Sequence, residues 1–275
     1  MRIITRWSFS KLFLVTACST AAFAYLQLPA QRPQFETASI KPSNSADRRL
    51  FFNMNPELYR VSNITVKRLI QQAYGIKAFQ LEGGPGWAGS DLFDISAKPE
   101  APANGDQLKL MLQSLLADRF QLAVRRETRQ MPVYGLVVAK NGPKLKEPAV
   151  PAPNPADGSP RAPVRITIRR GLLDAPVATT AGLADLLSDF LGVKVENQTG
   201  LTGAYAMRLE WQPDENQVAM FQGMGVPEGF GAPPPDPLGP SLFAALQEQL
   251  GLRLESQKGP VDMLVIERVE RPSAN

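Results

Sequence analysis

One succession of residue patterns occurs twice in this chain and limits the folds that it can adopt. Residues 117–140, ADRFQLAVRRETRQMPVYGLVVAK, are typical of the end of a helix, a strand, a polar turn and a second strand, and residues 249–268, QLGLRLESQKGPVDMLVIER, have the same pattern. A helix with a leucine stripe needs a cover, and two apolar strands that follow it can supply one. The pattern therefore predicts a scaffold of helices on sheets that is built twice.

The two occurrences match position by position, which favours an internal repeat. The alternative is one continuous α+β domain whose helices share a leucine-rich end. We expect the matched positions to form equivalent helix faces and core strands: Leu108, Leu112 and Leu116 with Leu242, Leu246 and Leu250, and Pro132, Val133, Leu136 and Val137 with Pro260, Val261, Leu264 and Val265.

The fold class that follows is α+β, with two related units at residues 35–147 and 164–272. Each unit is expected to pack two helices on a small, mainly antiparallel sheet. Residues 148–163 are rich in proline and are expected to link the units, and a Pro/Gly-rich loop is expected at 212–240. Proline and glycine interrupt both helices and strands, which is why these segments are assigned to neither.

The first residues have the pattern of an export signal. Arg2, Arg6 and Lys11 precede an uncharged run from residue 12 to residue 31, and Ala24 ends a small-x-small site. We expect residues 1–24 to be a signal peptide, with cleavage as late as residue 30 as a variant. The expected location is periplasmic or extracellular. An uncleaved membrane anchor, or lipidation of the single cysteine, Cys18, is the alternative.

The basic pI of about 9.2 belongs mainly to that signal. Subtracting its three cations from the 30 basic residues leaves 27, against 26 acidic residues. A nearly neutral chain exerts no long-range attraction on polyanions, so we expect no nucleic-acid partner. Membrane contact is expected only if Cys18 is lipidated or the signal is not cleaved.

The sequence contains no histidine, which removes the commonest general base and metal ligand. Triads built on imidazole and the usual zinc sites are thereby excluded. A carboxylate hydrolase could still use Asp91, Asp94, Glu127 or Glu210, but a chain with 26 acids offers such pairs by chance. We predict no catalytic residue, no metal site and no cofactor.

Two aromatic residues are the candidates for contact with a ligand or partner. Trp87 follows a GGPG turn, and Tyr205 follows the turn GLTG. The alternative for both is a place in the apolar core. Two acidic patterns, PDENQ at 213–217 and the pair Asp185 and Asp189, are expected to be a solvated loop and a solvated helix face.

Several longer stretches resemble a known family. FETASIKPS, GGPGW, LLADRFQLAVRRETRQMPVYGLVVAKNGPKLK, NQTGLTGAYAMRLEW and GPSLFAALQEQLGLRLESQKGPVDMLVIERVERP, between residues 35 and 272, resemble the soil-associated family of secreted bacterial proteins, a domain of unknown function expanded in acidobacteria. The resemblance implies export and, in some members, attachment to membrane-bound sensor peptidases. It implies no activity and no site residues. A looser similarity is to the short N-terminal domain of secretins and TonB-linked receptors.

These observations predict an exported, non-catalytic binding or interaction module of the cell envelope. Its partner is expected to be an envelope protein or a small ligand. The alternatives are a carboxylate- or lysine-based hydrolase, and a sensor-type domain that works with a membrane peptidase.

Overall fold

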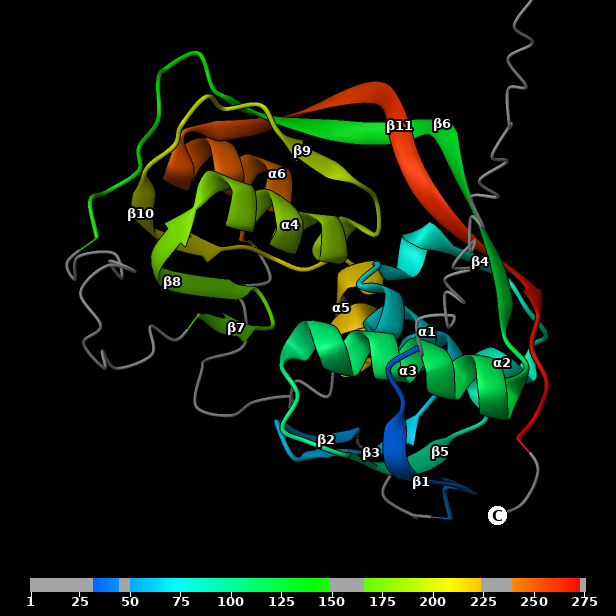
Figure 1. The fold of residues 1–275 in the computed structure, drawn as a ribbon. Helices are drawn as coiled ribbons and strands as arrows, with labels where there is room; N and C mark the ends of the chain where they lie inside the picture. Colours follow the sequence, from blue (N-terminus) through cyan, green and yellow to red (C-terminus); the bar gives the residue numbers. More distant parts are fainter. Residues whose placement is uncertain (1–31, 45–49, 149–165, 224–238, 273–275) are drawn as a thin grey trace, which may run out of the picture. The chain divides into compact units, whose positions relative to one another are not determined.

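The two repeated segments each form one long strand in the computed structural model. β6 (Ala123–Val138) and β11 (Leu252–Arg268) pair antiparallel from end to end, with Val138 opposite Leu252 and Ala123 opposite Arg268 (Figure 1). The expected hairpin within each segment is therefore wrong. The polar turns, in which we expect Arg126 and Lys258, are instead parts of the two strands. Solvated polar residues suit a two-stranded ribbon as well as they suit a turn.

The structure describes residues 32–44, 50–148, 166–223 and 239–272. The expected export signal with Cys18, linker residues 149–163 and most of the expected Pro/Gly-rich loop lie outside these ranges. Within the described ranges, no helix has the length and apolar character needed to cross a membrane.

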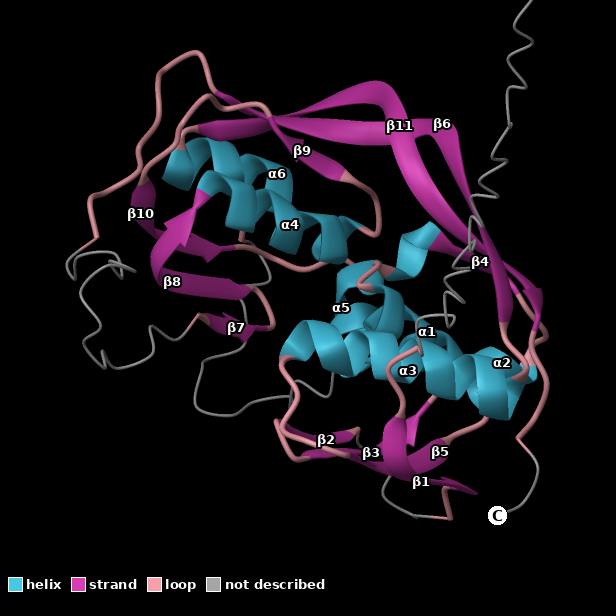
Figure 2. Ribbon diagram, viewed as in Figure 1, coloured by secondary structure: helices cyan, strands magenta, loops and turns pink. Residues whose placement is uncertain are grey.

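The fold is α+β, and the strands of the described residues form three sheets (Figure 2). The first sheet has the order β1 (Phe35–Pro42), β5 (Phe93–Pro99), β3 (Leu58–Ile64), β2 (Phe51–Asn55). The second has the order β10 (Ala204–Glu210), β8 (Leu172–Thr179), β7 (Thr167–Arg169). The third has the order β4 (Leu81–Gly83), β11, β6, β9 (Val195–Asn197), and only its two short outer strands pair in parallel.

The longer helices pack on the first two sheets. Along the chain they are α1 (Val66–Tyr74), the 3-10 turn η1 (Ala78–Gln80), α2 (Trp87–Ser90), α3 (Gly105–Phe120), α4 (Thr180–Leu191), α5 (Glu215–Gly223), α6 (Leu242–Ala245) and the π turn η2 (Leu246–Leu250). The helix α5 lies inside segment 212–240, which we expected to be a loop. Its first turn is capped by Asp214, whose carboxylate accepts the Gln217 N–H at 2.8 Å.

The helices α1 and α4 begin and end in the same way. Thr65 and Thr179 each accept a backbone N–H of the first turn through the side chain, and Gly75 and Gly192 each end the helix at a φ of 62°. Glycine reaches this left-handed conformation without steric cost. In each half of the chain a hairpin, a helix, a short strand, a further strand, a helix and a long strand follow in this order. The recurrence agrees with an internal repeat, which stays a prediction.

Of the three apolar clusters in the described residues, the two large ones are completed by strands that cross from one half to the other, and the small third one lies on those strands. The first core packs α1 and α3 on the first sheet; its buried residues include Tyr59, Val61, Leu69, Ile70, Leu116, Phe120, Leu264 and Ile266. The second core packs α4 and α6 on the second sheet; its buried residues include Leu136, Leu173, Leu183, Leu187, Trp211, Leu246 and Leu252. Thus the end of β11 completes the first core and the end of β6 completes the second. The boundaries at 147 and 164 stay a prediction, but the packing crosses them.

Candidate functional site

The strand β2 is an exposed edge that carries apolar side chains. It is the last strand of the first sheet, and all five of its residues, FFNMN, are exposed. The exposed fractions are 57% for Phe51, 39% for Phe52 and 48% for Met54. Single exposed apolar residues are common on proteins, but three on one short edge strand are unusual.

A tight hairpin positions this edge against β3. The turn residues Pro56 and Glu57 join Asn55 to Leu58, and the Asn55 side-chain oxygen accepts the Glu57 N–H at 2.9 Å. Asparagine favours this local bond, which replaces a backbone turn contact. The register that results places Asn53 opposite Arg60.

One face of β2 continues the buried face of β3, and the other face does not. Met54 lies opposite Tyr59 and Phe52 opposite Val61, and opposed residues share one face of a sheet. Tyr59 and Val61 are fully buried in the first core, so Phe52 and Met54 continue this apolar layer to the edge. The Phe52 ring meets the Tyr59 ring edge-on at 5.8 Å between centroids.

Tyr59 is a fixed support for this edge. Its hydroxyl donates to the Gln72 side-chain oxygen on α1 at 2.6 Å, and its ring also contacts Phe35. Burial raises the pKa of the Tyr59 phenol well above its usual value. The ring against which Phe52 lies is therefore held by β3, by α1 and by β1.

The other sheet edges among the described residues all carry charge. β1 contains Glu36 and Lys41, β10 contains Arg208 and Glu210, and β4, β7 and β9 each contain one charged residue. Charged residues, proline and bulges are the usual means by which proteins prevent pairing at a free edge. The strand β2 has neither charge nor proline.

Trp87 and Tyr205 pack against different cores. Trp87 begins α2, meets the Phe93 ring at 6.5 Å and is covered by the Arg271 guanidinium at 4.9 Å from its ring centroid. Tyr205 lies in β10 and packs against the second core. Each residue therefore has a packing role, and their predicted contact with a ligand stays a prediction.

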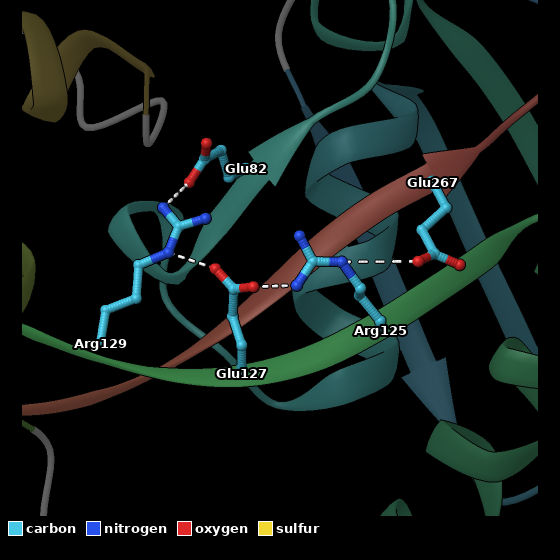
Figure 3. Close-up of polar contacts among 5 residues, drawn as sticks. All are labelled: Glu82, Arg125, Glu127, Arg129 and Glu267. Atoms are coloured by element: carbon cyan, nitrogen blue, oxygen red, sulfur yellow. Dashed lines mark hydrogen bonds and ion pairs between the residues drawn. The ribbon is translucent and has the colours of Figure 1, made fainter.

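Glu127 lies in a row of ion pairs on the long ribbon (Figure 3). Its two carboxylate oxygens face Arg125 and Arg129, and Arg129 also pairs with Glu82 on β4. Arg125 reaches Glu267 on β11 at 3.4 Å. Both oxygens of Glu127 are thus occupied by cations, which suits a link between three strands better than proton transfer to a substrate.

The other carboxylates that were considered for hydrolysis have partners of their own. The partners are Arg271 for Asp91, the Asn63 backbone N–H for Asp94, and Arg208 for Glu210. No contact in the described part of the chain joins any two of the four candidate acids. The arrangement therefore offers no facing pair of carboxylates.

The two acidic patterns have structural roles. Asp185 and Asp189 on α4 both pair with the Lys77 ammonium, at 3.1 and 2.8 Å. The Asp185 side chain is 68% exposed, as expected of a solvated helix face, and this face also carries ion pairs. Lys77 follows α1 and is only 20% exposed, so the ion pairs connect the two halves of the chain. The stretch PDENQ, expected to be a loop, instead starts α5. Among the described residues, no group of three or more possible metal ligands occurs.

Comparison with known proteins gives one match. The model of a family described as "Protein of unknown function (DUF3738)" matches residues 67–269. Neither the curated proteins nor the solved structures gave a match.

Proposed function

Because the chain belongs to the DUF3738 family of proteins of unknown function, we propose its function from the geometry of its own surface. The protein is an exported, non-catalytic interaction module of the cell envelope that binds an extended segment along the free edge of β2. The carrying observation is that this edge is exposed, apolar and uncharged beside a buried core. Since β2 precedes the matched residues, the proposal concerns this chain rather than its family.

Strand addition is the binding mode that fits such an edge. An extended segment that joins a sheet gains backbone hydrogen bonds from the edge strand, and its side chains gain specificity from those beside it. The partly exposed Phe52 and Met54 offer apolar contacts at the border of the first core. An edge that lacked protection and had no partner would be an aggregation hazard, which favours a binding role.

The export part of the proposal is supported by residues 1–31. Their cations, their uncharged run and the small-x-small site at Ala24 are the parts of a secretory signal. Fractionation of cells that produce the full chain, followed by N-terminal sequencing, tests it. We expect an envelope or secreted form that begins between residues 25 and 31. A cytoplasmic form that retains Met1 would contradict export.

A site-specific photo-crosslinker tests the edge. Benzoylphenylalanine is introduced at Phe51, which is 57% exposed on β2, or at Leu110, which is 47% exposed on α3 and serves as the matched control. Irradiation in envelope extracts and in concentrated pure protein should give discrete adducts from position 51 only. Equal yields at the two positions, or no adduct at either, would refute the edge as the binding surface.

A further inference from the structure

The edge of β2 is complementary to itself. We propose that the segment it binds is β2 of a second copy of this chain, paired antiparallel around a two-fold axis at Asn53. This inference rests on the function proposed above, because it names the partner of the same edge. It follows from the phase of the hydrogen bonds, the order of the side chains and the charges near the axis.

The hydrogen-bond phase allows this pairing. Residues opposite each other in an antiparallel pair alternate between hydrogen-bonded and non-hydrogen-bonded pairs. The register pairs Asn55 with Leu58 and Asn53 with Arg60. Because a two-residue hairpin closes on a hydrogen-bonded pair, this geometry assigns hydrogen bonds to Asn55 with Leu58 and, by alternation, to Asn53 with Arg60. The backbone groups of Phe52 and Met54 therefore point away from β3 to the free edge. A two-fold axis at Asn53 places Phe52 of each copy opposite Met54 of the other copy. There the two residues can form backbone hydrogen bonds with each other.

The side chains match in the same register. Phe52 of one copy lies beside Met54 of the other on the core face, and thioether-to-ring contacts are favourable. Asn53 meets its own counterpart on the outer face, where each amide can both donate and accept. The apolar layer of Tyr59 and Val61 then continues across the axis into the second copy. A one-residue shift would instead move asparagine onto the apolar face.

The charges on the described residues near the axis do not oppose the pairing. The nearest described charged residue on β3 is Arg60, opposite Asn53. Across the axis the two Arg60 backbones lie three strand spacings apart, or about 14 Å. This exceeds the Debye length of about 8 Å at physiological ionic strength, so their repulsion is screened. The contact is short, and the dimer is expected to be weak and dependent on concentration.

Disulfide trapping tests the axis. In a chain whose Cys18 is replaced by serine, N53C places two thiols at a non-hydrogen-bonded pair, whose Cα atoms are about 4.5 Å apart. That distance lies within the range of disulfides. The control F51C lies on the same exposed face, but its two thiols are separated by four residues along the strands, or about 13 Å. Mild oxidation should yield at least ~10-fold more covalent dimer from N53C than from F51C, since only the first pair is within reach.

Sedimentation velocity of the unmodified chain and of N53K supplies the second readout. The unmodified chain should show a dimer that grows with concentration, whereas N53K places two ammonium groups at the axis and should weaken dimerisation by at least ~10-fold. Circular dichroism checks that N53K is folded. Equal trapping of N53C and F51C, or a chain that stays monomeric at its highest soluble concentration, would overturn self-pairing. If position 51 still crosslinks to another protein, edge binding stands without the self-pairing; if nothing crosslinks there, both proposals fail.

Discussion

Replacing Leu264 with alanine tests the crossing of β11 into the first core. Leu264 is 2% exposed and packs in that core, with Leu81 of β4 as its parallel neighbour. Removing roughly three carbon groups at about 0.8 kcal/mol each gives about 2.4 kcal/mol of lost transfer free energy. The cavity left behind raises the expected loss of unfolding free energy to about 2–5 kcal/mol. Urea denaturation should show a lower midpoint and an unchanged slope.

The place at which the structure is weakened distinguishes two alternatives. One is a crossed ribbon, in which β6 and β11 each complete a core of the other half of the chain, and the other is two separate units. In L264A, hydrogen exchange should quicken first in α1 and α3, although these helices lie more than a hundred residues earlier in the sequence. The mirror variant L136A should quicken exchange in α4. Lys258→Ala is the control, because Lys258 is exposed on the same strand and should cost within about 0.5 kcal/mol. A loss below about 1 kcal/mol in L264A, or faster exchange confined to α4, would refute the reasoning.

Three further predictions concern single contacts. Gly251 and Gly192 both end helical turns at positive φ, of 65° and 62°, and Gly192→Ala should lower the free energy of unfolding by about 1 kcal/mol. Gly251→Ala should lower it clearly more, because the new methyl group would collide with the backbone at Gly142. The denaturation midpoints of the two variants test the difference. Lys77→Ala removes the ion pairs with α4 and should cost at most about 1 kcal/mol, with a smaller loss in 1 M than in 0.05 M salt when denaturation is repeated at both. Burial raises the pKa of the Tyr59 phenol, so the contribution of this group to the free energy of unfolding is full at neutral pH and is lost as the pH rises above ~10, the pKa of tyrosine in the unfolded chain. In Tyr59→Phe, the free energy of unfolding should therefore fall less steeply between about pH 10 and pH 11.5. An unchanged slope would contradict this.

The helix faces and their ends could be predicted from the sequence because they depend on local order. Leu108, Leu112 and Leu116 are all buried on α3, as their spacing predicts. The long strands could not be distinguished from hairpins by their sequence. Their central residues are polar on both faces, so there is no alternation of apolar and polar residues to show that the strand continues. Proline at 132 and at 260 also favours a break in each strand, because proline lacks a backbone N–H. In the described structure each lies outside the spans that pair with β9 and β4, where a strand has a free side and tolerates a missing N–H.

The candidate site was visible only as a strand. The stretch LFFNMN predicts one, and residues 51–55 form β2. Its apolar residues are typical of a buried strand, and only the long-range order of the sheet makes it an edge. The helix α5 was missed although Asp214 and Gln217 have the spacing of a capping pair. The prolines and glycines that follow from residue 223 onward favour a loop and conceal this capping signal.

The crossed ribbon also determines when the chain can fold. A chain that leaves the ribosome or a translocation channel N-terminus first presents α1, α3 and the first sheet long before Leu264 and Ile266 emerge. Until those residues arrive, the first core lacks part of its apolar cover, and the long-range pairing that supplies it is slow to form. Early segments of such a chain therefore remain open until the last strand has emerged, and only then can folding be completed.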